Sequence, residues 1–335
     1  MRVGIAGLGR IGRLHAQALL LDERVDQVVL HDALPRVAEA VAADLGEHAV
    51  AAPLPDLLAQ ADALVVAGST DSHGALLRAG VAARLPTFCE KPLAATLEES
   101  AALVAEVEAA RARVQVGFQR RFDAGYRRLR EACRSGELGF VHTVRANTFD
   151  TEPPPDAYVP VSGGIFRDCS IHDLDVLRFV TGQEVLEVYA IGGNLGGGAV
   201  QATGDVDTAA AVLTLSGGAV ATVSATRHNG AGHDVRMEVL GSEGALEAGL
   251  DDRLPTRSAE PGVELTAGTP ARSFIERFAA AYPAELRAFV DLALGKGASA
   301  CTPRDALEAA RVAEAATRSR LEHRPVRLDE VGGCA

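Results

Sequence analysis

The chain has 335 residues, a length that predicts two domains, and its composition of 47% hydrophobic and 23% charged residues is that of a globular protein. This balance excludes a disordered, collagen-like or coiled-coil chain. Lys and Arg number 33 against 45 Asp and Glu, and the resulting formal net charge of −12 disfavours nucleic acid and anionic membranes as partners.

Over residues 1–118, short β-rich runs alternate with helical patterns. This alternation is typical of a parallel α/β sheet. A helix is expected over Leu97–Arg113, because Thr96 and Glu99 form a capping-box pair ahead of its apolar positions. We predict that these 118 residues form one domain. The expected strands are Val3–Ala6, Gln27–Leu30, Ala63–Ala67, Thr87–Cys89 and Val114–Gly117.

From about residue 140 the pattern changes to alternating strands with few helices, which favours an α+β domain with a mainly antiparallel sheet. We predict a second domain over residues 119–335, with helices over Arg167–Val180 and Asp305–Leu321, the last of which can pack on the first domain. The uncharged stretch Thr208–Thr226 alternates on both sides of a glycine pair, so it predicts a hairpin rather than a membrane span. The expected strands are Val141–Phe149, Glu187–Gly192, Thr208–Leu215, Ala219–Thr226 and Val235–Leu240.

The five cysteines form no C-x-x-C pair, and none has a histidine nearby at the spacing of a zinc ligand. We interpret them as the reduced thiols of a cytoplasmic protein. The N-terminal residues lack the features of a secretory signal, which favours the same interpretation. No cluster of metal-ligand spacing is found in the sequence, so no metal site is predicted. The cysteines are Cys89, Cys133, Cys169, Cys301 and Cys334.

A glycine motif, Gly7, Gly9 and Gly12, follows the first expected strand and precedes a helical pattern. In this context the first glycine permits a tight turn, the second lets backbone amides approach a pyrophosphate, and the third lets the helix pack on the strand. The start of the helix, at Arg10 and Ile11, presents a partial positive charge to the same anion. The motif therefore predicts a dinucleotide site; the alternative is a glycine-rich turn without a ligand.

An acidic residue at the end of the second expected strand supports this site. Asp32 follows Gly12 by 20 residues, the spacing at which a carboxylate binds the ribose hydroxyls of a dinucleotide. Because Asp32 would repel the 2′-phosphate of NADP, the expected cofactor is NAD. Arg36 nearby leaves NADP possible.

Three polar residues follow the next strand, at the edge where open α/β sheets bind ligands. Ser69 and Thr70 are candidates to donate hydrogen bonds to the pyrophosphate or to the nicotinamide ribose. His73 is a candidate for the same role; the alternative is that it caps the following helix and has no part in the chemistry.

Glu90, Lys91 and Pro92 close the fifth expected strand at the same edge. An isolated lysine is most simply a residue of a surface loop. Its position at the ligand edge favours instead a lysine directed at the cofactor cleft, with Glu90 fixing the local geometry. The peptide bond at Pro92 is a candidate for the cis form.

Asp168 and His172 stand four residues apart, so on a helix they share one face. A carboxylate beside a histidine can orient the ring and leave its other nitrogen as an acid or base near neutral pH. The alternative is an ordinary pair on the protein surface. We expect Asp173 and Asp175 to occupy a solvated face and a contact between the domains.

Five ordered motifs resemble those of the Gfo/Idh/MocA oxidoreductases, and within that family the sequence is most similar to the inositol 2-dehydrogenases. The resemblance spans nearly the whole chain, and E-K-P combined with a downstream D-x-x-x-H is its most specific part. The motifs are G-L-G-R-I-G-R-L-H-A at 7–16, E-K-P at 90–92, G-F-Q-R-R-F-D at 117–123, S-G-G-I-F-R-D-x-x-x-H-D-x-D at 162–175 and R-F-x-x-A-Y-x-x-E at 277–285.

The resemblance implies a Rossmann domain and a C-terminal substrate-binding domain whose open sheet builds a homo-oligomer, usually a tetramer. It also implies a catalytic trio, which falls on Lys91, Asp168 and His172. The other implied positions are Gln119 near the nicotinamide, and Arg121, His233 and Tyr282 on the substrate side. Similar inositol enzymes tend to carry a tyrosine where this chain has His233, so the identity of the polyol stays open.

The predicted activity is hydride transfer from a ring carbon bearing a secondary hydroxyl to NAD, which gives a ketone on an inositol or a sugar. His172 would take the hydroxyl proton, Asp168 would support the imidazolium, and Lys91 would stabilise the negative charge developing on oxygen. One alternative is a sugar-modifying ketoreductase, epimerase or glycosidase that keeps NAD(P) bound and recycles it. Another is a non-catalytic NAD-sensing regulator, against which the presence of all three residues argues.

Overall fold

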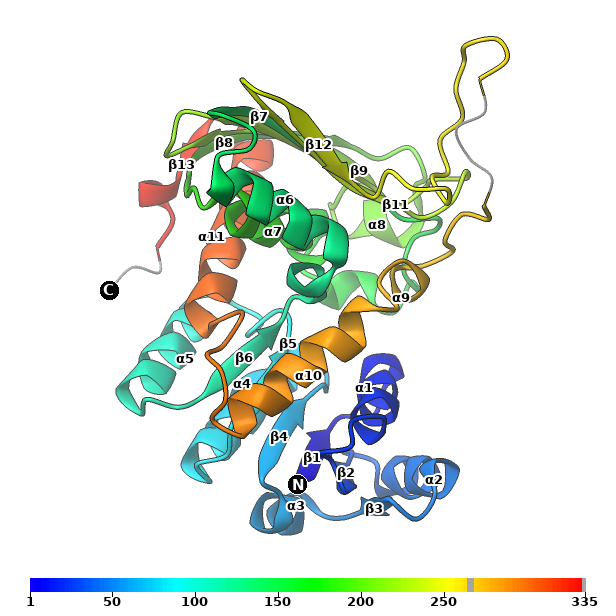
Figure 1. The fold of residues 1–335 in the computed structure, drawn as a ribbon, viewed down its shortest axis with the longest axis vertical. Coiled ribbons are helices and arrows are strands. Elements are labelled where there is room, and N and C mark those ends of the chain that lie inside the picture. The colour runs from blue at the N-terminus through cyan, green and yellow to red at the C-terminus, as the bar shows by residue number, and fades with distance from the viewer. Residues whose placement is uncertain (264–267, 333–335) are drawn as a thin grey trace. The chain divides into compact units, whose positions relative to one another are not determined.

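Two compact units make up the fold of this computed structural model, which describes residues 1–263 and 268–332 (Figure 1). The first unit contains residues 1–119 and 280–307, and the second contains residues 120–279 and 308–332. Residues 280–307, which were predicted to belong to the second domain, are part of the first unit. Within the described part of the chain, no helix has the length and apolar character needed to cross a bilayer.

The sheet of the first unit is parallel, as predicted, and has six strands in the order β3-β2-β1-β4-β5-β6, of which β3 was not among the five expected strands. Its central strand pairs with two neighbours in register, so that Ala6 lies opposite both His31 and Val66. The carboxyl ends of these three strands therefore share one edge. The strands are β1 (Arg2–Ala6), β2 (Gln27–His31), β3 (Ala49–Ala51), β4 (Ala63–Val66), β5 (Thr87–Glu90) and β6 (Val114–Gly117).

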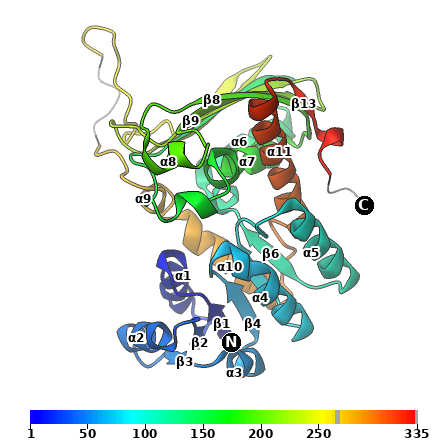
Figure 2. The same ribbon diagram turned by 180° about the vertical axis from the view of Figure 1, so that it is seen from behind.

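Helices cover the sheet of the first unit from both sides: α10 lies in front of it in Figure 1, and α4 lies in front when the unit is seen from behind in Figure 2. Helix α10 joins this unit because Leu286, Phe289 and Val290 are buried in the same core as the strand residues. The predicted cap of α5 is confirmed, since the Thr96 hydroxyl accepts a hydrogen bond from the Glu99 amide at 3.1 Å. The helices are α1 (Arg10–Leu20), α2 (Pro35–Leu45), α3 (Leu54–Gln60), α4 (Thr70–Ala82), α5 (Leu97–Ala109) and α10 (Ala281–Ala293).

The second unit is built on a seven-stranded sheet in the order β12-β11-β7-β10-β9-β8-β13. The sheet is mostly antiparallel, as predicted, and the one parallel pair among its described strands is β7 with β10. Residues of β9 alternate between exposed and buried, which is the period-two pattern seen in the sequence. The strands are β7 (Val141–Phe149), β8 (Val185–Gly193), β9 (Thr208–Leu215), β10 (Val220–Thr226), β11 (Asp234–Gly241), β12 (Ala245–Ala248) and β13 (Val326–Arg327).

Two helices, α6 and α7, lie side by side on one face of this sheet (Figure 1). The helix expected over Arg167–Val180 differs at its start, because residues Phe166–Ser170 form a π-helical turn before α7 begins at Ile171. The other helices are α6 (Ala124–Ser135), α7 (Ile171–Thr181), α8 (Gly198–Ala202), α9 (Phe274–Arg277) and α11 (Pro303–Glu322), with short turns η1 (Gln119–Phe122), η2 (Val159–Val161) and η4 (Leu328–Glu330). The division between the units falls inside α11, after Leu307.

Candidate active site

The glycine turn between β1 and α1 has the three properties that a dinucleotide requires. Gly7 adopts a φ of +97°, and a Cβ placed on it would lie 2.3 Å from the backbone nitrogen of Gly68. A Cβ on Gly12 would lie 2.0 Å from the Gly7 oxygen, so only glycine lets the helix pack this closely. A Cβ on Gly9 would meet no described atom within 4 Å. The space beside Gly9 and the start of α1 at Arg10 fit a bound pyrophosphate.

The carboxylate of Asp32 is held against this turn. It follows β2 directly, and its Oδ2 accepts a hydrogen bond from the Leu8 backbone N–H at 2.9 Å, while Oδ1 accepts one from Leu34 N–H at 3.0 Å. Because each carboxylate oxygen accepts more than one hydrogen bond, Asp32 retains capacity for ribose hydroxyls. Arg36 is exposed in the first turn of α2.

The polar residues after β4 take up different positions. Ser69 is the exposed N-cap residue of α4, and Thr70 begins the helix. His73 lies inside the helix and is 1% exposed, so it is not the cap. Its Nδ1 is 2.8 Å from the Pro92 carbonyl oxygen and its Nε2 is 3.2 Å from that of Gly68. The imidazole therefore lies between the loops that follow β4 and β5.

The loop after β5 places Lys91 at the carboxyl edge of the sheet, where it is half-buried. The Glu90 carboxylate accepts a hydrogen bond from the Lys91 backbone N–H at 3.2 Å, and its other oxygen lies 2.7 Å from Nε2 of His15. The cis peptide bond expected at Pro92 is confirmed. Gln119, at the end of this unit's continuous segment, is 4% exposed.

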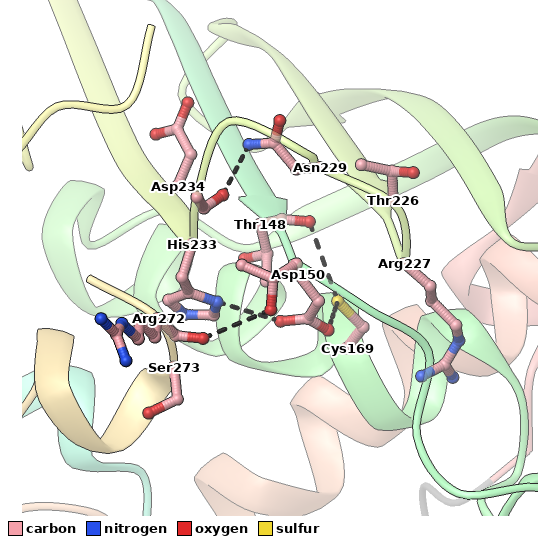
Figure 3. Close-up of polar contacts among 12 residues, drawn as sticks. Thr148, Asp150, Cys169, Thr226, Arg227, Asn229, His233, Asp234, Arg272 and Ser273 are labelled. Atoms are coloured by element: carbon pink, nitrogen blue, oxygen red, sulfur yellow. Dashed lines mark hydrogen bonds and ion pairs between the residues drawn. The ribbon is translucent and has the colours of Figure 1, made fainter. Parts of the chain in front are cut away.

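In the second unit, Asp168 lies in the π-helical turn and is held by two residues that the sequence analysis did not identify. Oδ1 accepts a hydrogen bond from the Tyr158 hydroxyl at 3.0 Å, and Oδ2 lies 3.2 Å from both terminal nitrogens of Arg227. Arg227 is only 2% exposed and directly follows β10. Figure 3 shows it beside Thr226, the last residue of that strand. Its separation of 59 residues from Asp168 explains why no local sequence pattern indicates the pair.

His172 is the second residue of α7 and follows Asp168 by one wide turn. Its side chain is half-buried, in contrast to the fully buried residues on either side of it. π-Helical turns occur often at functional sites, because the extra residue changes the direction in which neighbouring side chains point. The orientation of His172 by Asp168 remains a prediction.

Two buried ion pairs correct the expectation that Asp173 and Asp175 are solvated. Both carboxylates are fully buried within the second unit. Arg120 donates to Asp173 at 2.5 Å, and Thr148 donates to the same carboxylate at 2.7 Å. Arg121 binds Asp175 through two nitrogens, at 2.8 and 2.6 Å. A buried charge must be paired, so these bonds give Arg121 a structural role in addition to the predicted contact with substrate.

The buried imidazole of His233 pairs with the partly exposed carboxylate of Asp150, which lies between the imidazole and a thiol (Figure 3). Nδ1 of His233 is 3.2 Å from Asp150 Oδ1, and Sγ of Cys169 is 3.7 Å from Oδ2. Burial raises the pKa of the Cys169 thiol well above its usual range, so this thiol stays protonated at neutral pH. His233 also lines a small cavity of about 40 Å³ together with Asp234 and Arg277. No local sequence pattern indicated that Asp150 is the partner of His233.

Tyr282 belongs to α10 in the first unit, so the residues expected on the substrate side come from both units. Its side chain is 5% exposed, and its ring centroid is 6.2 Å from that of His15. Within residues 1–263 and 268–332, no three His, Cys, Asp or Glu side chains gather as potential metal ligands.

Both halves of the chain match one family. Residues 1–118 match the oxidoreductase family with an NAD-binding Rossmann fold, and residues 126–247 match the GFO/IDH/MocA C-terminal domain. A myo-inositol dehydrogenase of Streptomyces leeuwenhoekii is 40% identical, covering 95% of this chain and 97% of the relative. A myo-inositol 2-dehydrogenase of Thermotoga maritima is 35% identical, covering 99% and 100%.

Solved structures agree with the sequence matches. A probable dehydrogenase from Thermotoga maritima has a TM-score of 0.92 at 33% identity, covering 99% of this chain and 100% of that one. A scyllo-inositol dehydrogenase from Lactobacillus casei, solved with NAD(H) and scyllo-inositol, has a TM-score of 0.87 at 26% identity, covering 98% and 99%. From these matches, the chain is a member of the GFO/IDH/MocA oxidoreductases and carries their NAD-binding Rossmann fold.

Proposed function

We propose that this protein is an NAD-dependent dehydrogenase that oxidises a secondary hydroxyl of a cyclic polyol, with an inositol as the leading substrate. The observation that carries the proposal is a full-length likeness to inositol dehydrogenases in a chain that has Lys91, Asp168 and His172 at the motif positions. Inositol oxidation is the activity for which these relatives are named, and we propose the same activity for this chain.

The glycine turn and Asp32 are the groups that would hold NAD. Backbone amides at the start of α1 would bind the pyrophosphate, and the carboxylate of Asp32 would accept hydrogen bonds from the adenosine ribose. When bound, NAD supplies the acceptor for the hydride. Asp32 also disfavours a 2′-phosphate at this position, so we expect NAD to be preferred over NADP.

The proton of the substrate hydroxyl goes to His172, which we propose as the general base. Lys91 would donate a hydrogen bond to the same oxygen and stabilise its growing negative charge as the proton departs. Asp168 would stabilise the imidazolium that forms. The Arg227 guanidinium lies 3.2 Å from the Asp168 carboxylate and would hold it in place for this role.

The two alternative functions are less well supported. An enzyme that recycles bound NAD(P) would use the same residues, but the near full-length relatives named above are dehydrogenases. A non-catalytic sensor has no need of a proton acceptor. Turnover without accumulation of NADH would identify the recycling enzyme, and cofactor binding without any turnover would identify the sensor.

We further propose that the protein works in the cytoplasm as a homo-oligomer, with a tetramer favoured over a dimer. In support of a reducing compartment, no disulfide bond joins the four cysteines of the described residues, and Cys334 lies outside them. In support of assembly, the sheet of the second unit carries apolar side chains on the face opposite its buried one. These are Tyr189, Ile191, Val212 and Val220, which are between 42% and 55% exposed.

The experiment that tests the proposed activity is a screen for NADH formation, followed by its absorbance, with myo-, scyllo- and chiro-inositol and with glucose. We expect at least one inositol to be oxidised with NAD, faster than with NADP. The His172→Ala variant should lose most of this turnover and still bind NADH. Full turnover by that variant would contradict the assignment of the base.

A further inference from the structure

We infer that His15 is a positioning residue for Lys91 and acts through the carboxylate of Glu90. This inference rests on the proposed role of Lys91. His15 belongs to α1, three residues beyond Gly12, and its side chain is completely buried. Its Nε2 lies 2.7 Å from Glu90 Oε1, which joins the cofactor-binding helix to the loop that carries the lysine.

The direction of this hydrogen bond follows from the chemistry of its partners. The second oxygen of Glu90 accepts the backbone N–H of Lys91 at 3.2 Å. Carboxylate oxygens accept hydrogen bonds, so we assign the proton of the His15–Glu90 pair to Nε2 of His15, which donates it to Glu90. Nδ1 of His15 has no hydrogen-bond partner among the described residues. The imidazole therefore directs its hydrogen bonding at Glu90 alone.

The surroundings leave the carboxylate and the ring little freedom to move. The rings of His15 and Phe88 pack in a T-shaped arrangement, with centroids 5.2 Å apart and an interplanar angle of 79°, and the centroid of the Tyr282 ring is 6.2 Å from that of His15. Glu90 pairs in register with Gly117 of β6, and a Cβ on Gly117 would come within 3.0 Å of Glu90 Oε2. The absence of a side chain at position 117 thus makes room for the carboxylate.

This geometry has a consequence for the lysine. Glu90 holds the backbone N–H of Lys91, next to the Cα that carries the lysine side chain, and His15 fixes the rotamer in which Glu90 does so. Small displacements of a group that stabilises charge in the transition state lower the rate, while cofactor affinity depends on the glycine turn instead. Loss of the His15 hydrogen bond should therefore lower kcat more than it changes the KM for NAD.

Two amide substitutions of His15 distinguish the effect of the hydrogen bond to Glu90 from the effect of having a polar side chain at this position. In His15→Gln the amide nitrogen is as many bonds from the backbone as Nε2 of histidine, so it can still donate to Glu90. In His15→Asn the same amide is one methylene shorter and falls short. We expect kcat to fall about tenfold or more in His15→Asn and to stay within about threefold of the wild type in His15→Gln.

A control substitution at His48 and a second substitution at Glu90 accompany the His15 variants. His48→Asn changes an exposed histidine of the same unit and should leave kcat and KM unchanged. Glu90→Gln replaces one acceptor by an NH₂ group and should reproduce the loss, and its combination with His15→Asn should cost no more than the worse single variant. If His15→Asn does not fold, as judged by circular dichroism and NADH binding, the kcat of Glu90→Gln alone tests the inference.

The outcomes distinguish the inference from the proposed function. If Lys91→Ala retains full activity, the proposed role of Lys91 is wrong. If Lys91→Ala is inactive while His15→Asn and Glu90→Gln keep the wild-type kcat, His15 does not position the lysine. Losses that multiply in the double variant would also overturn the inference, because they would show two independent effects.

Discussion

Arginine side chains have two different roles in the second unit. Arg121 forms a buried, bidentate pair with Asp175, whereas Arg227 lies beside the predicted catalytic carboxylate of Asp168. Asp168 is 15% exposed at its side chain, so the charge of Arg227 acts in a partly desolvated setting where it is screened less than at the surface. Residues that support the chemistry here are therefore as important to identify as those that perform it.

Replacing Arg227 by methionine should destabilise the protein, because it removes the buried guanidinium that lies 3.2 Å from the Asp168 carboxylate. We expect the free energy of unfolding, measured by urea denaturation, to fall by about 3 kcal/mol. The control is Arg145→Met, which removes an exposed pair with Glu238 and should cost less than about 1 kcal/mol. Equal losses in the two variants would contradict the importance of the Arg227 contact.

At the level of single residues, the sequence predicted those whose role depends on neighbours along the chain. Gly7, Gly9 and Gly12 have the geometries that their spacing requires. Contacts between residues that are far apart in the sequence could not be predicted, because no local pattern links Arg227 to Asp168 or His233 to Asp150. His15 was within a quoted motif, yet its partner Glu90 stands 75 residues away.

Strands with a clear alternation or a compact apolar run were predicted well. β9 and β10 alternate between exposed and buried residues, and the apolar run of β4 is buried throughout. β3 has only three residues and was not predicted, and β12 was missed as well. Helix α10 was overlooked, although its buried residues Leu286, Phe289 and Val290 follow helical spacing. The π-helical turn at Phe166–Ser170 has no sequence signature of its own and changes the start of α7.

The glycine turn offers a prediction that separates binding from folding. Gly9→Ala adds a methyl group to open space at a negative φ, so the fold should be unaffected and the melting temperature should change by less than about 2 °C. Affinity for NAD should fall about tenfold or more, because the methyl group occupies the approach of the pyrophosphate.

The control for this prediction is Gly12→Ala. Its Cβ would collide with the Gly7 carbonyl, so the free energy of unfolding should fall by about 2 kcal/mol. Calorimetry of NAD binding and thermal unfolding of both variants check the pair. A Gly9→Ala variant that binds NAD like the wild type would show that the turn does not hold the cofactor.

At the scale of the whole molecule, the net charge of −12 gives no long-range attraction for an anionic cofactor. The attraction must be local, from the amides at the start of α1 and from nearby cationic side chains. An uncharged polyol needs no such steering, which makes a neutral substrate a better match to this acidic protein than an acidic one.

The proposed assembly depends on the apolar face of the second unit's sheet, where Tyr189 and Val212 are paired on adjacent strands. A glutamate at position 212, now 48% exposed, would place charge in that interface. We expect Val212→Glu to lower the mass measured by light scattering while the circular dichroism spectrum is retained. Leu34→Glu, at an equally exposed position of the first unit, should leave the mass unchanged. An unchanged mass in both would rule out this face as the interface.

The central claim is that a ring C–H of a cyclic polyol is transferred to NAD as hydride, and isotopic labelling tests it most directly. The protein should be incubated with NAD and with myo-inositol that carries deuterium on every ring carbon, and the reduced cofactor should be analysed by mass spectrometry; scyllo-inositol labelled in the same way serves if myo-inositol is not oxidised. We predict NADH one mass unit heavier than that from unlabelled substrate, formed together with a ketone. Unlabelled NADH, or no reduced cofactor with any labelled inositol, would contradict the account.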